Sequence, residues 1–234
     1  MIHRRIPMKN KALCLILFLA LALSALSSCA SSYETLYETV SNGITYRVNG
    51  ANGVPREIIV LNYDSVLWKK RINVTEEVGN LHGSYGFFTT DFNFDGKTDF
   101  MIACEKKEDD VYSYLCYINN GTNTSFAISD ELSALYNVRA NRELSAIFGF
   151  TREKTQTEGK YYALCDASTK YVWEKGALLP QIRASVTYYS KQKLYCYSVA
   201  YYDKETKSFG PTTDRWLSPR EYEQADMDFL YYFK

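Results

Sequence analysis

Residues 86–104 read Gly-Phe-Phe-Thr-Thr-Asp-Phe-Asn-Phe-Asp-Gly-Lys-Thr-Asp-Phe-Met-Ile-Ala-Cys, a polar loop between two apolar runs. The runs Gly86–Thr90 and Asp99–Cys104 are rich in residues that favour strands. Between them, side chains that carry an oxygen ligand recur at every second position and once more at the end: Asp91, Asn93, Asp95 and Asp99. The stretch therefore predicts a strand, a tightly wound loop and a second strand.

This donor pattern predicts a calcium site. Calcium takes six to eight oxygen ligands at about 2.3–2.6 Å, and alternate residues of a wound loop converge on one point. Gly96 permits the turn, and the backbone carbonyl of Lys97 is expected to face the ion, whereas the Phe side chains of the loop anchor it in the core. The ion would be structural, because three carboxylates repel one another without a cation. A solvated turn without metal is the alternative.

The loop starts like an EF-hand but does not end like one. Ile102 stands where an EF-hand needs a bidentate Glu, and the flanking runs are strands instead of helices. The pattern D-x-N-x-D-G-x-x-D instead resembles the calcium loop of FG-GAP and VCBS-type repeats, which lies between β-strands, usually in β-propellers. A propeller with several repeats would show several such loops, whereas this chain has one, so a compact β-domain with a single loop is favoured.

The first 28 residues predict an export leader. Residues 1–11 are basic, and residues 12–26 are almost wholly apolar but too short for a comfortable membrane span. The following Leu26-Ser27-Ser28-Cys29 resembles the lipobox of bacterial lipoproteins, in which the Cys sulfur receives a diacylglycerol and becomes the acylated amino terminus. Such acylation anchors stably. An ordinary secretory signal cleaved nearby, or an uncleaved helix, is the alternative.

The resulting domain prediction has three parts: a signal peptide over 1–28, lipidated Cys29 with a polar tether over 29–43, and one β-rich domain over 44–234. After the leader, the chain has 23 basic and 27 acidic side chains. No basic stripe is available to replace phosphate counterions, which argues against a nucleic-acid partner. The aromatic fraction of 15% argues against disorder.

Short β-rich runs alternate with turn residues through the remaining chain. Two short helices are expected, at Asp130–Tyr136 and from Ser218, where Ser218, Pro219 and Glu221 form a capping-box pattern. The fold class is therefore mainly β and antiparallel, either propeller-like or a compact β-domain. The predicted strands are Ile44–Val48, Arg56–Tyr63, Val66–Ile72, Gly86–Thr90, Asp99–Cys104, Val111–Ile118, Glu143–Thr151, Lys160–Cys165, Thr169–Trp173, Ile182–Tyr189 and Leu194–Tyr202.

No catalytic set of residues is recognisable. His82 is the one histidine after the leader, so a zinc site with two histidines in one chain is excluded, and any nucleophile–histidine pair would have to use it. The spacing of Cys104, Cys116, Cys165 and Cys196 is no zinc pattern, and buried free thiols or disulfides both fit an exported protein. The three Trp residues, Trp68, Trp173 and Trp216, either pack between strands or line a binding face.

The sequence favours a binding protein over an enzyme. The order of strand pair, calcium loop and Tyr-rich strand loosely resembles a group of exported bacterial proteins, some of which are periplasmic immunity proteins that inhibit lysozyme-like effectors. This resemblance implies a lipid-anchored protein of the cell envelope that binds a protein partner, with a cell-wall hydrolase as the sharpest candidate. An envelope enzyme that acts on polysaccharide or peptidoglycan, and a carbohydrate-binding adhesive module, are the alternatives.

Overall fold

A computed structural model describes residues 33–74, 81, 86–106 and 111–224. The chain divides into two units, Met1–Glu34 and Thr35–Lys234. Of the first unit only residues 33 and 34 are described, so the predicted leader and Cys29 lie outside the described residues, as does His82. Among the described residues, no helix is long and apolar enough to cross a membrane.

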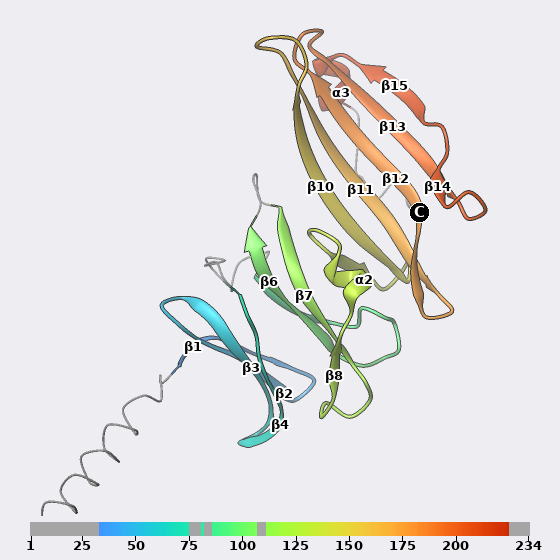
Figure 1. The fold of residues 1–234 in the computed structure, drawn as a ribbon. Coiled ribbons are helices and arrows are strands. Elements are labelled where there is room, and N and C mark those ends of the chain that lie inside the picture. Colours follow the sequence, from blue (N-terminus) through green and yellow to red (C-terminus); the bar gives the residue numbers. More distant parts are fainter. Residues whose placement is uncertain (1–32, 75–80, 82–85, 107–110, 225–234) are drawn as a thin grey trace, which may run out of the picture. The chain divides into compact units, whose positions relative to one another are not determined.

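The first sheet is a four-stranded antiparallel meander, with strands in sequence order (Figure 1). It consists of β1 (Glu34–Ser41), β2 (Ile44–Ala51), β3 (Val54–Asn62) and β4 (Ser65–Arg71). Strand β1 falls within the segment predicted as a polar tether, and the compact unit begins at Thr35 instead of Ile44. The strand forms because Leu36 and Tyr37 pack against the core. In addition, Glu38 pairs with Arg47 of β2 at 2.5 Å.

The second sheet is also a four-stranded antiparallel meander, and it contains the predicted strand–loop–strand unit. It consists of β5 (Phe87–Thr90), β6 (Asp99–Lys106), β7 (Tyr112–Asn119) and β8 (Phe126–Ile128). Strands β6 and β7, both predicted, pair antiparallel, and Met101 lies opposite Cys116. Strand β8 was not expected, because three residues are too few to show an alternating pattern.

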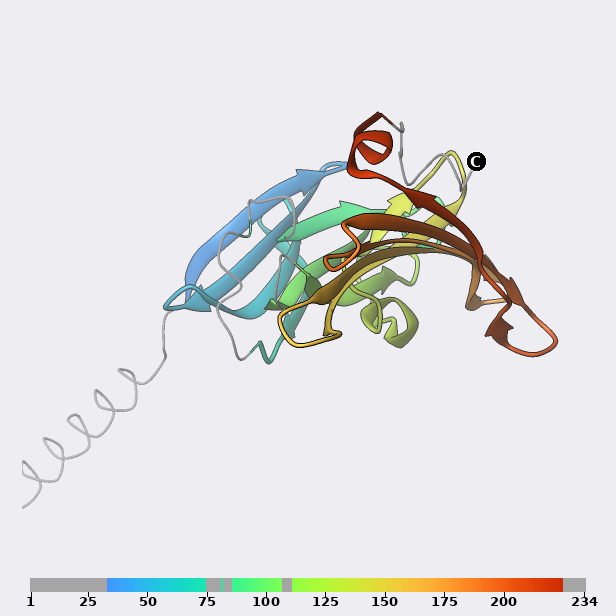
Figure 2. The same cartoon turned by 90° about the horizontal axis from the view of Figure 1, so that it is seen from above.

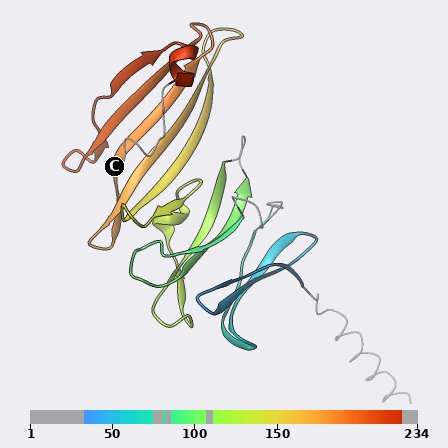
Figure 3. The ribbon, with the colours of Figure 1, turned by 180° about the vertical axis from the view of Figure 1, so that it is seen from behind.

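The third sheet has seven strands. Its long strands, β10 to β13, lie side by side in Figures 2 and 3. Its path is β14–β13–β12–β11–β10–β9, with β15 also paired to β13. The bounds are β9 (Arg139–Asn141), β10 (Ala146–Gln156), β11 (Tyr162–Glu174), β12 (Ala177–Tyr189), β13 (Leu194–Asp203), β14 (Ser208–Phe209) and β15 (Thr213–Leu217).

Strand β11 joins what the sequence predicted as two separate strands, Lys160–Cys165 and Thr169–Trp173. The polar residues between them continue the strand because Asp166 lies opposite Arg152 of β10 and accepts two hydrogen bonds from its guanidinium, at 2.6 and 2.8 Å. Strand β12 begins earlier than predicted and accommodates Pro180 next to a register shift in β11. Proline is confined to such irregular positions because it has no N–H to donate.

The two predicted helices are present but short. Helix α2 (Asp130–Ser133) is capped by Ser129, whose side chain accepts the N–H of Leu132 at 3.3 Å. Helix α3 (Pro219–Gln224) begins with the expected capping box, in which Glu221 accepts from the backbone N–H of Ser218 at 2.8 Å. The structure therefore confirms a mainly β, antiparallel fold with two short helices. Among the described residues, two sheets are four-stranded meanders and a third has seven strands, so the sheets do not repeat one four-stranded propeller blade.

The main hydrophobic core draws on both four-stranded sheets and on residues of β9, β10, β11 and β12 in the seven-stranded one. Aromatic rings fill much of it: Phe100 stacks with Tyr117 at 4.9 Å between ring centroids, and Trp68 meets both rings at 5.6–5.8 Å. Trp68 is thus a packing residue. A smaller cluster lies on one face of the seven-stranded sheet around Val186 and Tyr197. The large core holds the ends of β5 and β6, and so positions the loop between them.

Candidate metal centre

The loop 91–98 connects β5 to β6 within the second sheet. The two strands pair directly up to Thr90 and Asp99, so the loop closes on itself at its base. Phe92 and Phe100 are fully buried and Phe94 packs against the same core, as expected for the apolar residues of the pattern. The side chains that the sequence singled out as oxygen donors are therefore held on a short, anchored turn.

The Asp91 carboxylate is the centre around which the loop winds. Its Oδ1 accepts the backbone N–H of Asp95 at 3.1 Å and its Oδ2 accepts that of Gly96 at 2.8 Å. Gly96 has a φ of +87°, which a residue with a Cβ adopts only under strain. Asp91 itself is 6% exposed. The sequence pattern thus produces a loop whose backbone N–H groups point at its first carboxylate.

The Asp95 carboxylate accepts hydrogen bonds from both the backbone N–H and the side-chain ammonium of Lys97. Its Oδ1 accepts the backbone N–H of Lys97 at 2.9 Å, and the Lys97 ammonium lies 3.1 Å from Oδ2. Partial burial opposes the charge, but these hydrogen bonds outweigh it and lower the pKa of the Asp95 carboxyl. The Oδ1 of Asn93 also accepts the N–H of Asp95, at 3.3 Å. Sequence reasoning considered only the carbonyl of Lys97 and missed this ammonium.

Asp99 is the most buried member of the loop, with no exposed surface. One carboxylate oxygen accepts the N–H of Phe92 at 2.7 Å and the other accepts that of Asn119 at 2.8 Å. Burial first, and then the charges of Asp91 and Asp95, raise the pKa of Asp99 to about 6 despite these bonds. The three carboxylates therefore act on one another electrostatically, and a cation among them would relieve that repulsion.

The donor set fits calcium by its chemistry. Three carboxylates, one amide oxygen and a backbone carbonyl are the hard oxygen ligands that this ion takes. The arrangement is less complete: among the described residues, no group of three or more His, Cys, Asp or Glu side chains stands ready to hold a metal ion. Asp91 and Asp99 instead direct their oxygens at backbone N–H groups. The calcium ligands Asp91, Asn93, Asp95, Lys97 and Asp99 stay a prediction.

Trp173 ties the seven-stranded sheet to this loop. Its indole Nε1–H donates a hydrogen bond of 2.8 Å to the carbonyl of Phe92. The two residues are 81 positions apart in the sequence, so no local pattern could have revealed the contact. The third tryptophan, Trp216, is 54% exposed, with its ring 5.3 Å from that of Tyr189.

The four cysteines among the described residues are all free thiols. Cys116 and Cys196 are buried, whereas Cys104 and Cys165 are partly exposed. Burial raises the pKa of the Cys116 thiol to about 12. These cysteines therefore form no cross-link that would fix the candidate centre, and the strand pairing and aromatic core do so instead.

No protein-family model and no curated protein sequence matches the chain. Among solved structures, a Xanthomonas protein related to the type IV secretion system is 12% identical, with a TM-score of 0.36 over 78% of this chain and 87% of that one. An ulvan lyase, a polysaccharide lyase, is 12% identical, with a TM-score of 0.23 over 76% of this chain and 54% of that one. Both TM-scores are too low to indicate a shared fold.

Proposed function

We propose that this chain is a lipid-anchored protein of the bacterial cell envelope that carries one structural calcium ion and binds a protein partner there. The observation that carries the calcium part is the winding of the loop around Asp91 beside two further acidic side chains. Asp91, Asn93, Asp95, Asp99 and the carbonyl of Lys97 would hold the ion. When bound, it would neutralise these carboxylates and stabilise the loop.

Lipid anchoring rests on the sequence around Cys29, with its basic start, apolar core and lipobox in that order. It places the protein in the envelope, at the outer membrane or facing the periplasm in a cell with two membranes, and at the cell surface otherwise. The β-rich unit begins at Thr35, only six residues after the proposed anchor.

Binding of a protein partner is supported by large apolar side chains that the fold leaves in water. Tyr63 is 90% exposed at the turn between β3 and β4, and Val66 and Val40 of the same sheet are 57% and 64% exposed. Exposed aromatic residues are enriched where proteins associate. The most specific candidate for the partner is a cell-wall hydrolase, because the sequence loosely resembles exported immunity proteins.

Calcium is tested by thermal melting of the full chain, purified in detergent, with calcium and with chelator. Calcium at about 100 times its dissociation constant is expected to add about 2.7 kcal/mol of stability. Asp95→Ala is expected to lose most of this increment because it removes a charged ligand. Asp203→Ala is the matched control, since Asp203 ends strand β13 and its exposed carboxylate accepts the N–H of Glu205 in the following turn. Coincident melting curves for the wild-type chain would remove the ion from the proposal.

The partner is tested by incubating the purified protein with peptidoglycan, alone and together with a lysozyme. Reduced lysozyme activity in the mixture is the expected result for an inhibitor. Release of wall material by the protein alone would show an enzyme instead and would overturn the binding function. His82→Ala adds a second arm, because a binder is expected to keep its effect whereas a nucleophile–histidine enzyme would lose several orders of magnitude in rate.

A further inference from the structure

A polar pocket of about 220 Å³ lies where three turns of the chain meet. The turn between β1 and β2 supplies Asn42, the end of the loop 91–98 supplies Lys97 and Thr98, and the turn between β7 and β8 supplies Asn123. Ile44 gives it one apolar wall. The volume is below that of sites for drug-sized molecules, so it suits one small ligand, up to the size of a single sugar ring.

The lining is held by hydrogen bonds between the turns and within the turn that joins β7 to β8. The amide of Asn42 donates to the hydroxyl of Thr98 at 2.8 Å, and the amide of Asn119 donates to Oδ1 of Asn123 at 2.7 Å. The Oδ1 of Asn119 accepts the backbone N–H groups of Gly121 and Asn123, at 3.0 and 3.2 Å. Side chains held in this way lose little freedom when a ligand binds, which favours affinity.

The same groups keep hydrogen-bonding capacity for a ligand. A carboxamide has two N–H donors and a carbonyl with two lone pairs, and the bonds above use only part of this capacity on Asn42 and Asn123. Donors and acceptors placed together in this way match the adjacent hydroxyl groups of a sugar. A glycan ligand also fits the carbohydrate-binding module that the sequence left open as an alternative.

Lys97 adds the charge that selects among sugars. Its side chain is 42% exposed and its ammonium pairs with Asp95, which is itself 31% exposed. Exposed ion pairs contribute only about 0–1 kcal/mol, so the ammonium exchanges this carboxylate for that of a ligand at little cost. The pocket therefore combines amides for hydroxyl groups with one cation for an acidic group.

We propose that this pocket binds an acidic monosaccharide unit of a glycan, with the ligand carboxylate at Lys97 and its hydroxyl groups at Asn42 and Asn123. The proposal goes beyond the binding of a protein partner and does not require a metal ion. Two sources share this chemistry, the N-acetylmuramic acid of peptidoglycan strands whose stem peptide has been removed and the uronic acids of acidic polysaccharides. Each source has a neutral counterpart that lacks the carboxylate.

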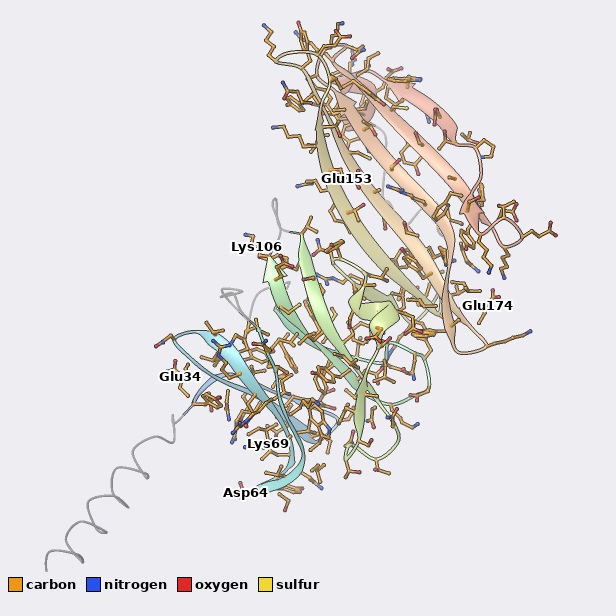
Figure 4. All side chains as sticks on the ribbon, in the orientation of Figure 1. Glu34, Asp64, Lys69, Lys106, Glu153 and Glu174 are labelled. Atoms are coloured by element: carbon orange, nitrogen blue, oxygen red, sulfur yellow. The ribbon has the colours of Figure 1, made fainter. Side chains whose placement is uncertain are left out.

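Isothermal titration calorimetry of the full chain in detergent tests this proposal, with calcium and with chelator. The probes are N-acetylmuramic acid against N-acetylglucosamine, and glucuronic acid against glucose. We expect saturable binding of at least one acid, with its neutral counterpart at least tenfold weaker. Lys97→Met is expected to remove this preference. The matched control is Lys204→Met, because Lys204 forms a similar surface ion pair with Glu174. Glu174 ends strand β11, and Figure 4 labels it.

Asn123→Asp is a second variant that preserves the fold. Asn123 has a φ of +58°, which Asp tolerates, and the Asp carboxylate still accepts from Asn119. We expect it to weaken acid binding at least tenfold by repulsion. Absence of binding by both acids, equal affinity for the neutral sugars, or full affinity in both pocket variants would overturn the proposal. If the chain binds an acidic sugar but calcium does not change its melting temperature, the pocket proposal stands and only the calcium ion is removed from the proposed function.

Discussion

The backbone N–H of Asn119 donates a hydrogen bond of 2.8 Å to Oδ1 of Asp99, across 20 residues of sequence. Asp99 is the last acidic residue of the candidate metal loop, and Asn119 organises the turn that lines the polar pocket. The bond is buried away from water, and its acceptor is a carboxylate. Hydrogen bonds to an ionised carboxylate are stronger than those between neutral groups. The candidate metal centre and the pocket are thus parts of one hydrogen-bonded framework.

Asp99→Ala is expected to destabilise the chain even in the presence of chelator. The substitution leaves the N–H groups of Phe92 and Asn119 without an acceptor, at about 1–3 kcal/mol each, so roughly 2–6 kcal/mol in the free energy of unfolding. Urea unfolding measures this difference. Asp95→Ala is the control, because the carboxylate of Asp95 is partly exposed and its loss in chelator should cost far less. Equal losses for the two variants would contradict a framework role for Asp99.

Trp173→Phe is expected to lower the free energy of unfolding by about 1–3 kcal/mol, because the carbonyl of Phe92 loses its indole donor. The ring itself is largely replaced, so the lost hydrogen bond dominates. Trp216→Phe is the matched control, since that side chain is 54% exposed and the change should stay within about 0.5 kcal/mol. A Trp173→Phe chain as stable as the control would show that the contact between Trp173 and the loop contributes nothing.

Iodoacetamide at pH 8 is expected to alkylate Cys104 and Cys165 in the native protein and to spare Cys116. The thiolate is the reactive form, and burial raises the pKa of Cys116 to about 12, so this thiol stays protonated as well as shielded. Peptide mapping by mass spectrometry locates the label, and denatured protein provides full labelling for comparison. Failure of these cysteines to react after denaturation without reductant would mean that they are paired in disulfides.

Cys29→Ser is expected to abolish lipidation and to leave the precursor uncleaved, because only the thiol accepts the diacylglycerol. Metabolic labelling with a palmitate analogue, followed by gel electrophoresis, measures both effects. Cys165→Ser is the control, since Cys165 lies on strand β11, far along the chain from the lipobox. Equal labelling of the Cys29→Ser chain and the wild-type chain would refute the lipid anchor.

Local sequence determined the fold class, most strands and both helix starts. Alternating apolar residues fix which face of a strand is buried, and Ser218 with Glu221 fixes the start of α3 through contacts within four residues. Local sequence failed at Glu34–Ser41 and at the join within β11. In both places the strand depends on residues far along the chain that the linear pattern does not display. Leu36 and Tyr37 pack against the core, and Asp166 pairs with Arg152 of the neighbouring strand.

The sequence by itself also predicted the candidate metal loop and its two flanking strands, because the donors and Gly96 lie within nine residues and need no distant segment. The ligand set stays a prediction. Only the tertiary structure decided what surrounds that loop. The indole of Trp173 on the Phe92 carbonyl, the Asn119 N–H on Asp99 and the pocket formed by Asn42 and Asn123 all join segments far apart in the chain. Such contacts depend on how sheets pack over a shared core, and the burial of that core fixes them in ways that residue spacing does not encode.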